Sequence, residues 1–290
     1  MGETIEIVKN LAAEHGDNFA IVVNHSGGKD SQRMLGFIRE TFPQIKTYVV
    51  MADTGFEHVK PVTAIEWART QAASYGLELH VVRNPNKTYL EMVEKRGMFP
   101  SPTTRQCTSD LKRGPIQKFI RSLKERVVIN CTGIRAAESA NRAKQNPWKL
   151  DEGVCLEQRI NKAGEVTQLA RTVYNWMPIF SESLKDVLNW HWQNNQPLHP
   201  VYVAEYHADG TKGGYLRRFS CRVCIFATDA DLRAIYVNDR EAFDAVAGLE
   251  QRMGFTMRHS KSLFQIINNE PSGDEKQYGS EEVYEAPCAA

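Results

Sequence analysis

Two hydrophobic periods alternate along the first half of the chain. Short aliphatic runs, typical of buried strands, recur between segments whose apolar residues fall at helical spacing. The runs are Phe19–Val23, Thr47–Met51, Leu77–Val82 and Val127–Cys131. The helical segments are Ile5–Leu11, Met34–Phe42, Val62–Ser74 and Ile116–Leu123. Short strands separated by helices predict βαβ crossovers, and therefore an α/β fold with a doubly wound parallel sheet.

The pattern changes near residue 180, where helical spacing replaces the aliphatic runs. Helices are predicted at Ser183–Gln193, Asp229–Val237, Arg240–Met253 and Ser262–Ile267. We therefore expect an α/β domain over 1–180, a smaller and mostly helical C-terminal subdomain over 181–270, and a polar, mobile tail over 271–290. In a doubly wound sheet the ligand lies at the carboxyl ends of the strands, so the segments that follow the strands carry the candidate site.

Composition limits the function classes. The 290 residues hold 36 Lys and Arg against 35 Asp and Glu, a net charge of +1, which argues against a strongly basic nucleic-acid coat protein. No apolar run approaches the ~20 residues that span a bilayer, and the N-terminus lacks the pattern of a secretory signal. We expect a soluble, cytoplasmic protein with no membrane partner.

The first predicted strand is followed directly by Ser26-Gly27-Gly28-Lys29-Asp30-Ser31. Two glycines at a strand-to-helix turn let backbone N–H groups converge on an anion, and the helix N-terminus adds its positive dipole end. Lys29 supplies a mobile positive charge, and Asp30 suits a phosphate that carries Mg²⁺. A turn whose serines merely cap the helix is the plainer alternative. The segment is neither a Walker A loop nor a G-x-G-x-x-G fingerprint.

This hexapeptide resembles the PP-loop, S-G-G-x-D-S, of the adenine nucleotide α-hydrolases. The resemblance implies a doubly wound fold, ATP and Mg²⁺ as ligands, and cleavage of ATP between its α- and β-phosphates. The loop would hold the leaving pyrophosphate while the adenylyl group passes to an acceptor.

Later segments are similar to the branch of that superfamily that contains the phosphoadenosine phosphosulfate (PAPS) reductases. Asp53-Thr54-Gly55 follows the second strand and is similar to the family's second nucleotide-facing turn. The stretch from Gly133 to Arg142 is similar to a G-x-R-x-x-E-S-x-x-R motif, in which Arg135 would clamp an anion. The plainer alternatives are a helix cap at Asp53 and a surface arginine at position 135. The resemblance covers about residues 15–230.

Six cysteines include the pair Cys221 and Cys224, whose C-x-x-C spacing lets both thiolates reach one metal. A thioredoxin-like redox pair is the alternative. The resemblance places Cys107 where iron–sulfur members of the branch carry other cluster ligands. It implies a [4Fe–4S] cluster on Cys107, Cys221 and Cys224, with Cys155 as the best guess for a fourth ligand and zinc as the second choice of metal.

These observations predict an ATP pyrophosphatase that adenylates an acceptor in sulfur transfer or nucleic-acid modification. Lys29, Asp30 and Arg135 would be its catalytic residues. A sulfonucleotide (PAPS or APS) reductase is the alternative, in which Cys288 would be the catalytic thiol. The acceptor, a sulfur donor and homodimer formation stay open. A nucleic-acid partner would contact a groove lined by Arg105, Lys112, Arg113, Arg142 and Lys144.

Overall fold

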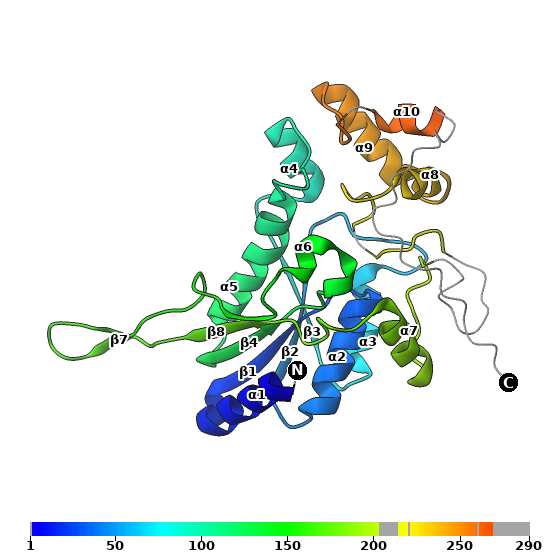
Figure 1. Cartoon of the computed structure of the whole chain (residues 1–290). Helices are drawn as coiled ribbons and strands as arrows, with labels where there is room; N and C mark the ends of the chain where they lie inside the picture. Colours follow the sequence, from blue (N-terminus) through cyan, green and yellow to red (C-terminus); the bar gives the residue numbers. More distant parts are fainter. Residues whose placement is uncertain (1, 203–213, 220, 260, 269–290) are drawn as a thin grey trace.

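A six-stranded sheet forms the centre of the computed structural model, which describes residues 2–202, 214–219, 221–259 and 261–268. The strand order is β3-β2-β1-β4-β8-β5, and only the edge strand β5 runs antiparallel to its neighbour. This arrangement confirms the predicted doubly wound α/β fold (Figure 1). The strands are β1 (Phe19–Asn24), β2 (Thr47–Asp53), β3 (Leu79–Arg83), β4 (Val127–Cys131), β5 (Trp148–Leu150) and β8 (Thr172–Trp176).

Helices cover both faces of the sheet. Alternate residues of β1 enter different cores, because side chains of a strand point to opposite faces in turn. Ile21 and Val23 pack in one core with apolar residues of the helices on that face, whereas Val22 packs in another with Ile120. The first face carries α1 (Gly2–His15), α2 (Lys29–Thr41) and α3 (Ala64–Ala73), and the second carries α5 (Gly114–Ser122).

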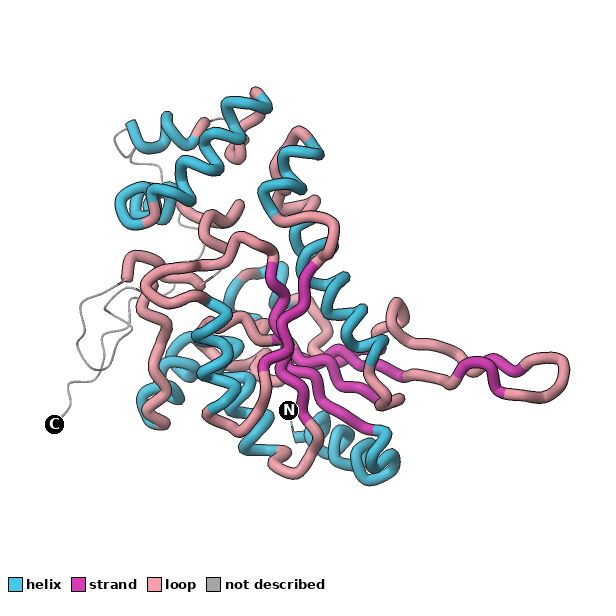
Figure 2. The backbone as a smooth tube through the Cα atoms, turned by 180° about the vertical axis from the view of Figure 1, so that it is seen from behind, coloured by secondary structure: helices cyan, strands magenta, loops and turns pink. Residues whose placement is uncertain are grey.

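Several elements differ from the hydrophobic pattern. Helix α2 begins at Lys29, before the predicted start near Met34, so the glycine loop leads straight into its first turn. The pattern also missed α4 (Tyr89–Arg96), strands β5 and β8, a π-helix at Cys107–Arg113 and the hairpin of β6 (Arg159–Ile160) and β7 (Val166–Gln168). The hairpin projects from the sheet, away from the C-terminal helices (Figure 2).

The C-terminal helices divide between two places. Helices α8 (Asp229–Asn238), α9 (Arg240–Met253) and α10 (Leu263–Asn268) share a core with α4. Helix α7 (Leu184–Gln193) instead packs on α2, where a Cβ added to Gly36 would overlap the indole of Trp190. Helix α7 therefore adjoins the α/β part, and the domain boundary at residue 180 stays a prediction. The predicted tail, 271–290, lies outside the described residues.

None of the helices in the described ranges is long and apolar enough to cross a membrane.

Candidate functional site

The glycine loop lies at the point where the strand order reverses, between β1 and its neighbours β2 and β4. This switch point is where open α/β sheets bind their ligands. Gly27 adopts a left-handed backbone conformation with φ 77°, which glycine accepts without strain. Because α2 begins at Lys29, the loop's backbone amides lie at the positive end of the helix dipole.

Buried side chains hold the loop in shape. The Nδ1 atom of His25 accepts from the Gly27 backbone N–H at 3.2 Å and lies 2.9 Å from Ser31 Oγ. Burial lowers the pKa of His25 to about 3, so the ring is neutral at physiological pH. The Ser26 and Ser31 hydroxyl oxygens are 3.2 Å apart. The two serines and His25 therefore form one connected polar network under the loop.

The segment after β4 packs directly on this loop. A Cβ added to Gly133 would lie 3.1 Å from the backbone oxygen of Asp30 and 3.2 Å from the Ser31 nitrogen. Only glycine permits an approach this close without displacing the neighbouring backbone. Gly133 thus brings Arg135, two residues further on, to the first turn of α2.

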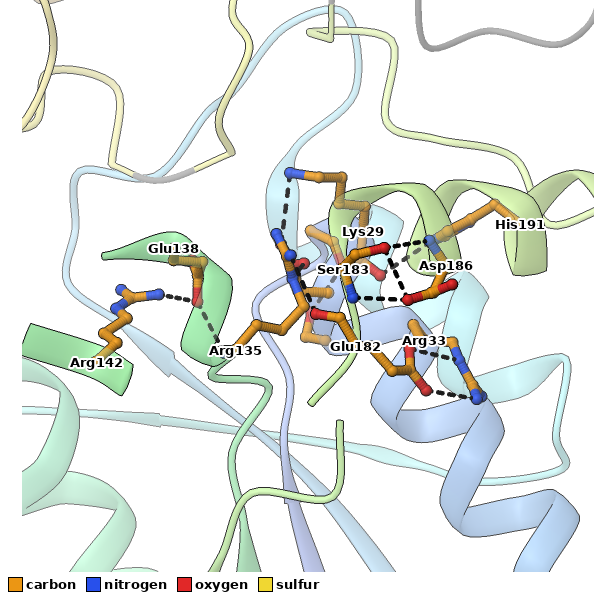
Figure 3. A network of polar contacts seen from close by, with 12 residues as sticks. Lys29, Arg33, Arg135, Glu138, Arg142, Glu182, Ser183, Asp186 and His191 are labelled. Atoms are coloured by element: carbon orange, nitrogen blue, oxygen red, sulfur yellow. Dashed lines mark hydrogen bonds and ion pairs between the residues drawn. The ribbon is translucent and has the colours of Figure 1, made fainter. Parts of the chain in front are cut away.

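Lys29, Asp30 and Arg135 form a charge cluster, and Figure 3 labels its two buried cations, Lys29 and Arg135. Arg135 Nε donates to Asp30 Oδ1 at 2.6 Å, and Lys29 Nζ is 3.5 Å from Asp30 Oδ2. Burial by itself would raise the pKa of Asp30, but the charges of Lys29 and Arg135 outweigh it and the pKa is lowered. The cluster therefore carries two cations and one carboxylate, a net positive charge suited to a polyphosphate.

An aromatic cover closes the loop. The hydroxyl of Tyr202 accepts from the Lys29 backbone N–H at 3.1 Å, and Lys29 Nζ lies 5.4 Å from the centre of the Tyr202 ring. The Phe219 Cβ is 3.3 Å from the position that a Cβ on Gly28 would take. Tyr202 is 1% exposed and Lys29 4%. The tyrosine hydroxyl thus occupies the position at which an anion would accept from the Lys29 amide.

The cover and the helix contact behind it were missed by sequence reasoning. His191 Nε2 lies 2.9 Å from the Lys29 backbone oxygen and fixes the start of α2 from the α7 side. Tyr202 and His191 stand more than 160 positions beyond Lys29, so no local pattern could connect them with the loop.

The Asp53-Thr54-Gly55 turn follows β2, and its polar groups bind to one another and to neighbouring side chains of the protein. Asp53 accepts from the Gly55 N–H at 2.8 Å and pairs with Arg83 at 2.7 Å. Glu57 accepts from the Thr54 hydroxyl at 2.6 Å. A small cavity of about 190 Å³ lies beside this turn. The structure shows Asp53 capping the turn, and its contact with a nucleotide stays a prediction.

Three of the predicted metal ligands share one neighbourhood. Cys107, Cys221 and Cys224 pack against the same core as α4 and α9, close enough for their charges to act on Tyr89 and Lys112. Burial raises the pKa of Cys221, whereas the charge and hydrogen bond of Lys112 lower it. The Tyr89 hydroxyl is buried and without a hydrogen-bond partner among the described residues. Three soft donors beside the half-buried Lys112 cation fit a thiolate-bound group by their chemistry.

The thiol side chains of Cys107, Cys221 and Cys224 are not arranged as a metal site in this structure. Within the described ranges, no three His, Cys, Asp or Glu side chains lie close enough to hold one ion. The structure does not bring Cys155 to the other three thiols. Its sulfur instead accepts from the Val173 N–H at 3.3 Å in the core on the α5 face. Cys131 is buried in the α2 face of the sheet. Cys288 lies outside the described residues.

Three residues of the predicted nucleic-acid groove have contacts within the protein. Lys112 points among the thiols, and the charge of Cys221 is the main cause that raises its pKa. Arg142 is paired with Glu138. Arg105 lies over the ring of Phe226. Lys112 and Arg142 thus have contacts within the protein, and a nucleic-acid groove along these residues stays a prediction.

The parallel sheet and the glycine loop at its switch point define the PP-loop class of α/β proteins. The family model of the phosphoadenosine phosphosulfate reductase domain matches residues 20–212. The chain belongs to this family, as the sequence motifs predicted.

Two curated relatives are similar but have no described activity. An uncharacterised 37.8 kDa protein of Escherichia phage 186 is 24% identical over 300 residues, which cover 88% of this chain and 82% of that protein. An uncharacterised protein of Methanocaldococcus jannaschii is 30% identical over 141 residues, which cover 49% of this chain but only 28% of that protein.

Solved structures with a similar fold include enzymes of different activity. The PAPS reductase of Candida auris, in a phosphate complex, has a TM-score of 0.42 at 16% identity, covering 67% of this chain and 81% of that one. The U34-tRNA thiolase NcsA of Methanococcus maripaludis, with its [4Fe-4S] cluster, has a TM-score of 0.44 at 16% identity, covering 97% and 91%. Similarity this low carries no argument about chemistry.

Proposed function

We propose that the protein is a PAPS reductase-like ATP pyrophosphatase. It cleaves ATP between the α- and β-phosphates and adenylates an acceptor, in sulfur transfer or nucleic-acid modification. The observation that carries this proposal is the intact Ser26–Ser31 loop at the switch point, with two buried cations against it. Such a loop binds the β- and γ-phosphates of ATP. A nucleotide without these phosphates would leave part of the loop unused.

Each residue of the loop has a role in this reaction. The Lys29 backbone N–H and the serine hydroxyls donate to the pyrophosphate once Tyr202 has moved aside. The Lys29 ammonium stabilises the negative charge that develops on the leaving group. Arg135 holds Asp30 as a carboxylate, and this oxygen ligand suits the Mg²⁺ that arrives with the nucleotide.

The thiols are proposed to hold a cluster. Cys107, Cys221 and Cys224 would bind a [4Fe–4S] cluster, which supplies an iron with an open position for sulfur when three residues ligate it. The half-buried Lys112 would offset the negative charge of the thiolates. The placement of Cys155 does not favour it as a fourth ligand, and zinc remains the second choice. Reduced thiols fit the cytoplasm, where we expect the protein to act.

Release of pyrophosphate from Mg·ATP tests the nucleotide chemistry. Lys29→Ala should slow pyrophosphate release by about 10²-fold or more, the scale of losing one preorganised charge. Lys9→Ala, on the exposed face of α1, removes the same charge far from the loop and should leave the rate unchanged. Equal rates for the wild type and Lys29→Ala would refute the role of the loop.

Anaerobic purification with metal and sulfide analysis tests the cluster. The wild type should be brown, with iron and labile sulfide in similar amounts, because thiolate–iron sites absorb visible light. Replacing Cys107 by Ser should bleach the protein, whereas Cys155→Ser, the matched control, should not. Colourless protein with one zinc would replace the iron assignment, and metal-free protein would overturn both.

The family match also favours a second candidate, a sulfonucleotide reductase. Such an enzyme needs a thiol that attacks the sulfonate of PAPS or APS, and Cys288 would supply it. Sulfite release from PAPS or APS, with dithiothreitol added as the reductant that frees sulfite from the thiosulfonate, would support the reductase if Cys288→Ser abolishes it.

A further inference from the structure

A cavity of about 510 Å³ opens beside the π-helix that begins at Cys107. This volume falls within the range of ~300–1,000 Å³ that is usual for ligand pockets. It lies between the end of α4 and the π-helix that carries Cys107. Among the described residues its lining holds two cations and three neutral polar side chains but no carboxylate: Arg96, Thr104, Arg105, Gln106 and Ser109. This chemistry fits an anionic ligand.

The two guanidinium groups are available to such a ligand. In the part of the chain that the structure describes, neither Arg96 nor Arg105 pairs with a carboxylate. Arg96 donates only to the amide oxygen of Gln106, at 3.1 Å. The nearby Asp110 carboxylate is already neutralised by Lys87 at 2.6 Å. Unpaired guanidinium groups bind phosphate oxygens with two parallel hydrogen bonds, so phosphate is the anion they fit best.

An exposed aromatic ring lies next to these cations. Phe226 is 43% exposed, and the Arg105 guanidinium is 5.9 Å from the centre of its ring. An exposed phenylalanine beside arginine offers a face on which an unpaired base can stack. Phe226 follows Cys224 by two positions, so its ring lies on the second thiol-bearing segment and contacts Arg105 of the cavity lining.

We propose that this cavity binds an unpaired stretch of nucleic acid. Phosphodiester groups contact Arg96 and Arg105, and one base stacks on Phe226. RNA and single-stranded DNA share this chemistry. This inference names nucleic acid as the acceptor, and in that respect it rests on the proposed function. The bound strand would lie beside Cys107 and Cys224. The binding itself requires neither ATP nor a cluster.

Fluorescence anisotropy of labelled twelve-nucleotide RNA and DNA single strands, without ATP, tests the site. Arg105→Ala and Arg96→Ala should each weaken binding by about fivefold or more, and each should lower the slope of log affinity against log salt by about 0.7. Phe226→Leu should weaken binding by about fivefold or more through loss of stacking, without changing that slope. Arg159→Ala, on the exposed hairpin, is the matched control for loss of charge.

The outcomes separate the alternatives. Tighter binding of RNA or of single-stranded DNA shows which of the two nucleic acids is the ligand, and either result supports the site. No binding by the wild type, equal weakening by Arg159→Ala, or equal competition by polyglutamate overturns it, the last because an acidic peptide would then be the ligand. Pyrophosphate release is measured separately. A chain that cleaves ATP but binds no strand loses this inference and keeps the proposed function.

Discussion

Removing the Tyr202 hydroxyl should open the glycine loop to phosphate. In the structure this hydroxyl accepts from the Lys29 backbone N–H at 3.1 Å, so a pyrophosphate oxygen must displace it. Tyr202→Phe keeps the ring, and with it the contact between the Lys29 ammonium and the aromatic face. The substitution therefore removes one competitor for the amide and leaves the packing of the cover in place.

The size of the effect on pyrophosphate binding follows from the hydrogen bond between the Tyr202 hydroxyl and the Lys29 amide. A neutral hydrogen bond contributes about 0.5–1.5 kcal/mol net. Without the competing hydroxyl, pyrophosphate should bind between about twofold and twelvefold more tightly. The ligand-free variant should also be less stable than the wild type, because its buried Lys29 amide has lost a partner.

Isothermal titration with pyrophosphate and with α,β-methylene-ATP measures both affinities without turnover. Thermal unfolding with and without pyrophosphate reports the loss of stability and its recovery. Tyr236→Phe, on α8 against Phe243, is the matched control and should change neither value. Unchanged or weaker pyrophosphate binding by Tyr202→Phe would show that the hydroxyl does not compete with the ligand.

Three further predictions concern packing, pH and the tail. Gly36→Ala should lower the free energy of unfolding by about 1–2 kcal/mol in urea titrations, because its Cβ would overlap Trp190. Gly153→Ala, where a Cβ has ordinary clearance, should stay within about 0.5 kcal/mol, and equal losses would refute the packing argument. The lowered pKa of Asp30 stabilises the fold above its unfolded value of about 3.9, and this stability is lost as the pH falls through the lower folded pKa. Acid titration of Asp30→Asn should thus show a shallower fall in stability below pH ~4 than the wild type, and identical curves would contradict the ion pairs. Cys288→Ser should leave pyrophosphate release within about threefold, and a complete loss would move the assignment to the reductase.

The sequence predicted the fold through its four aliphatic runs, because buried parallel strands leave a strong local signal. It missed β8, whose five residues Thr172–Trp176 interleave apolar and polar side chains and are mostly half-buried. It missed the true start of α2 as well, because the polar residues Lys29–Gln32 lack an apolar period. Their helical state depends on the loop and on the contact with Gly133.

The sequence predicted those parts of the candidate site that belong to a contiguous motif. The loop and the C-x-x-C pair are local patterns, and the structure places both at the carboxyl ends of the strands. The aromatic cover and the inward turn of Lys112 arise from contacts between distant segments. A single sequence carries no signal for those contacts, since each residue by itself is an ordinary one.

The bond that is cleaved in ATP tests the central claim most directly. Phosphorus-31 NMR of Mg·ATP, incubated anaerobically with the protein and a mixture of RNA and DNA single strands, resolves all phosphate products in one spectrum. The account predicts pyrophosphate together with AMP or an adenylated strand, and formation of both slowed by about 10²-fold or more with Lys29→Ala. ADP and orthophosphate as the products would place the cleavage at the β,γ-bond and contradict it.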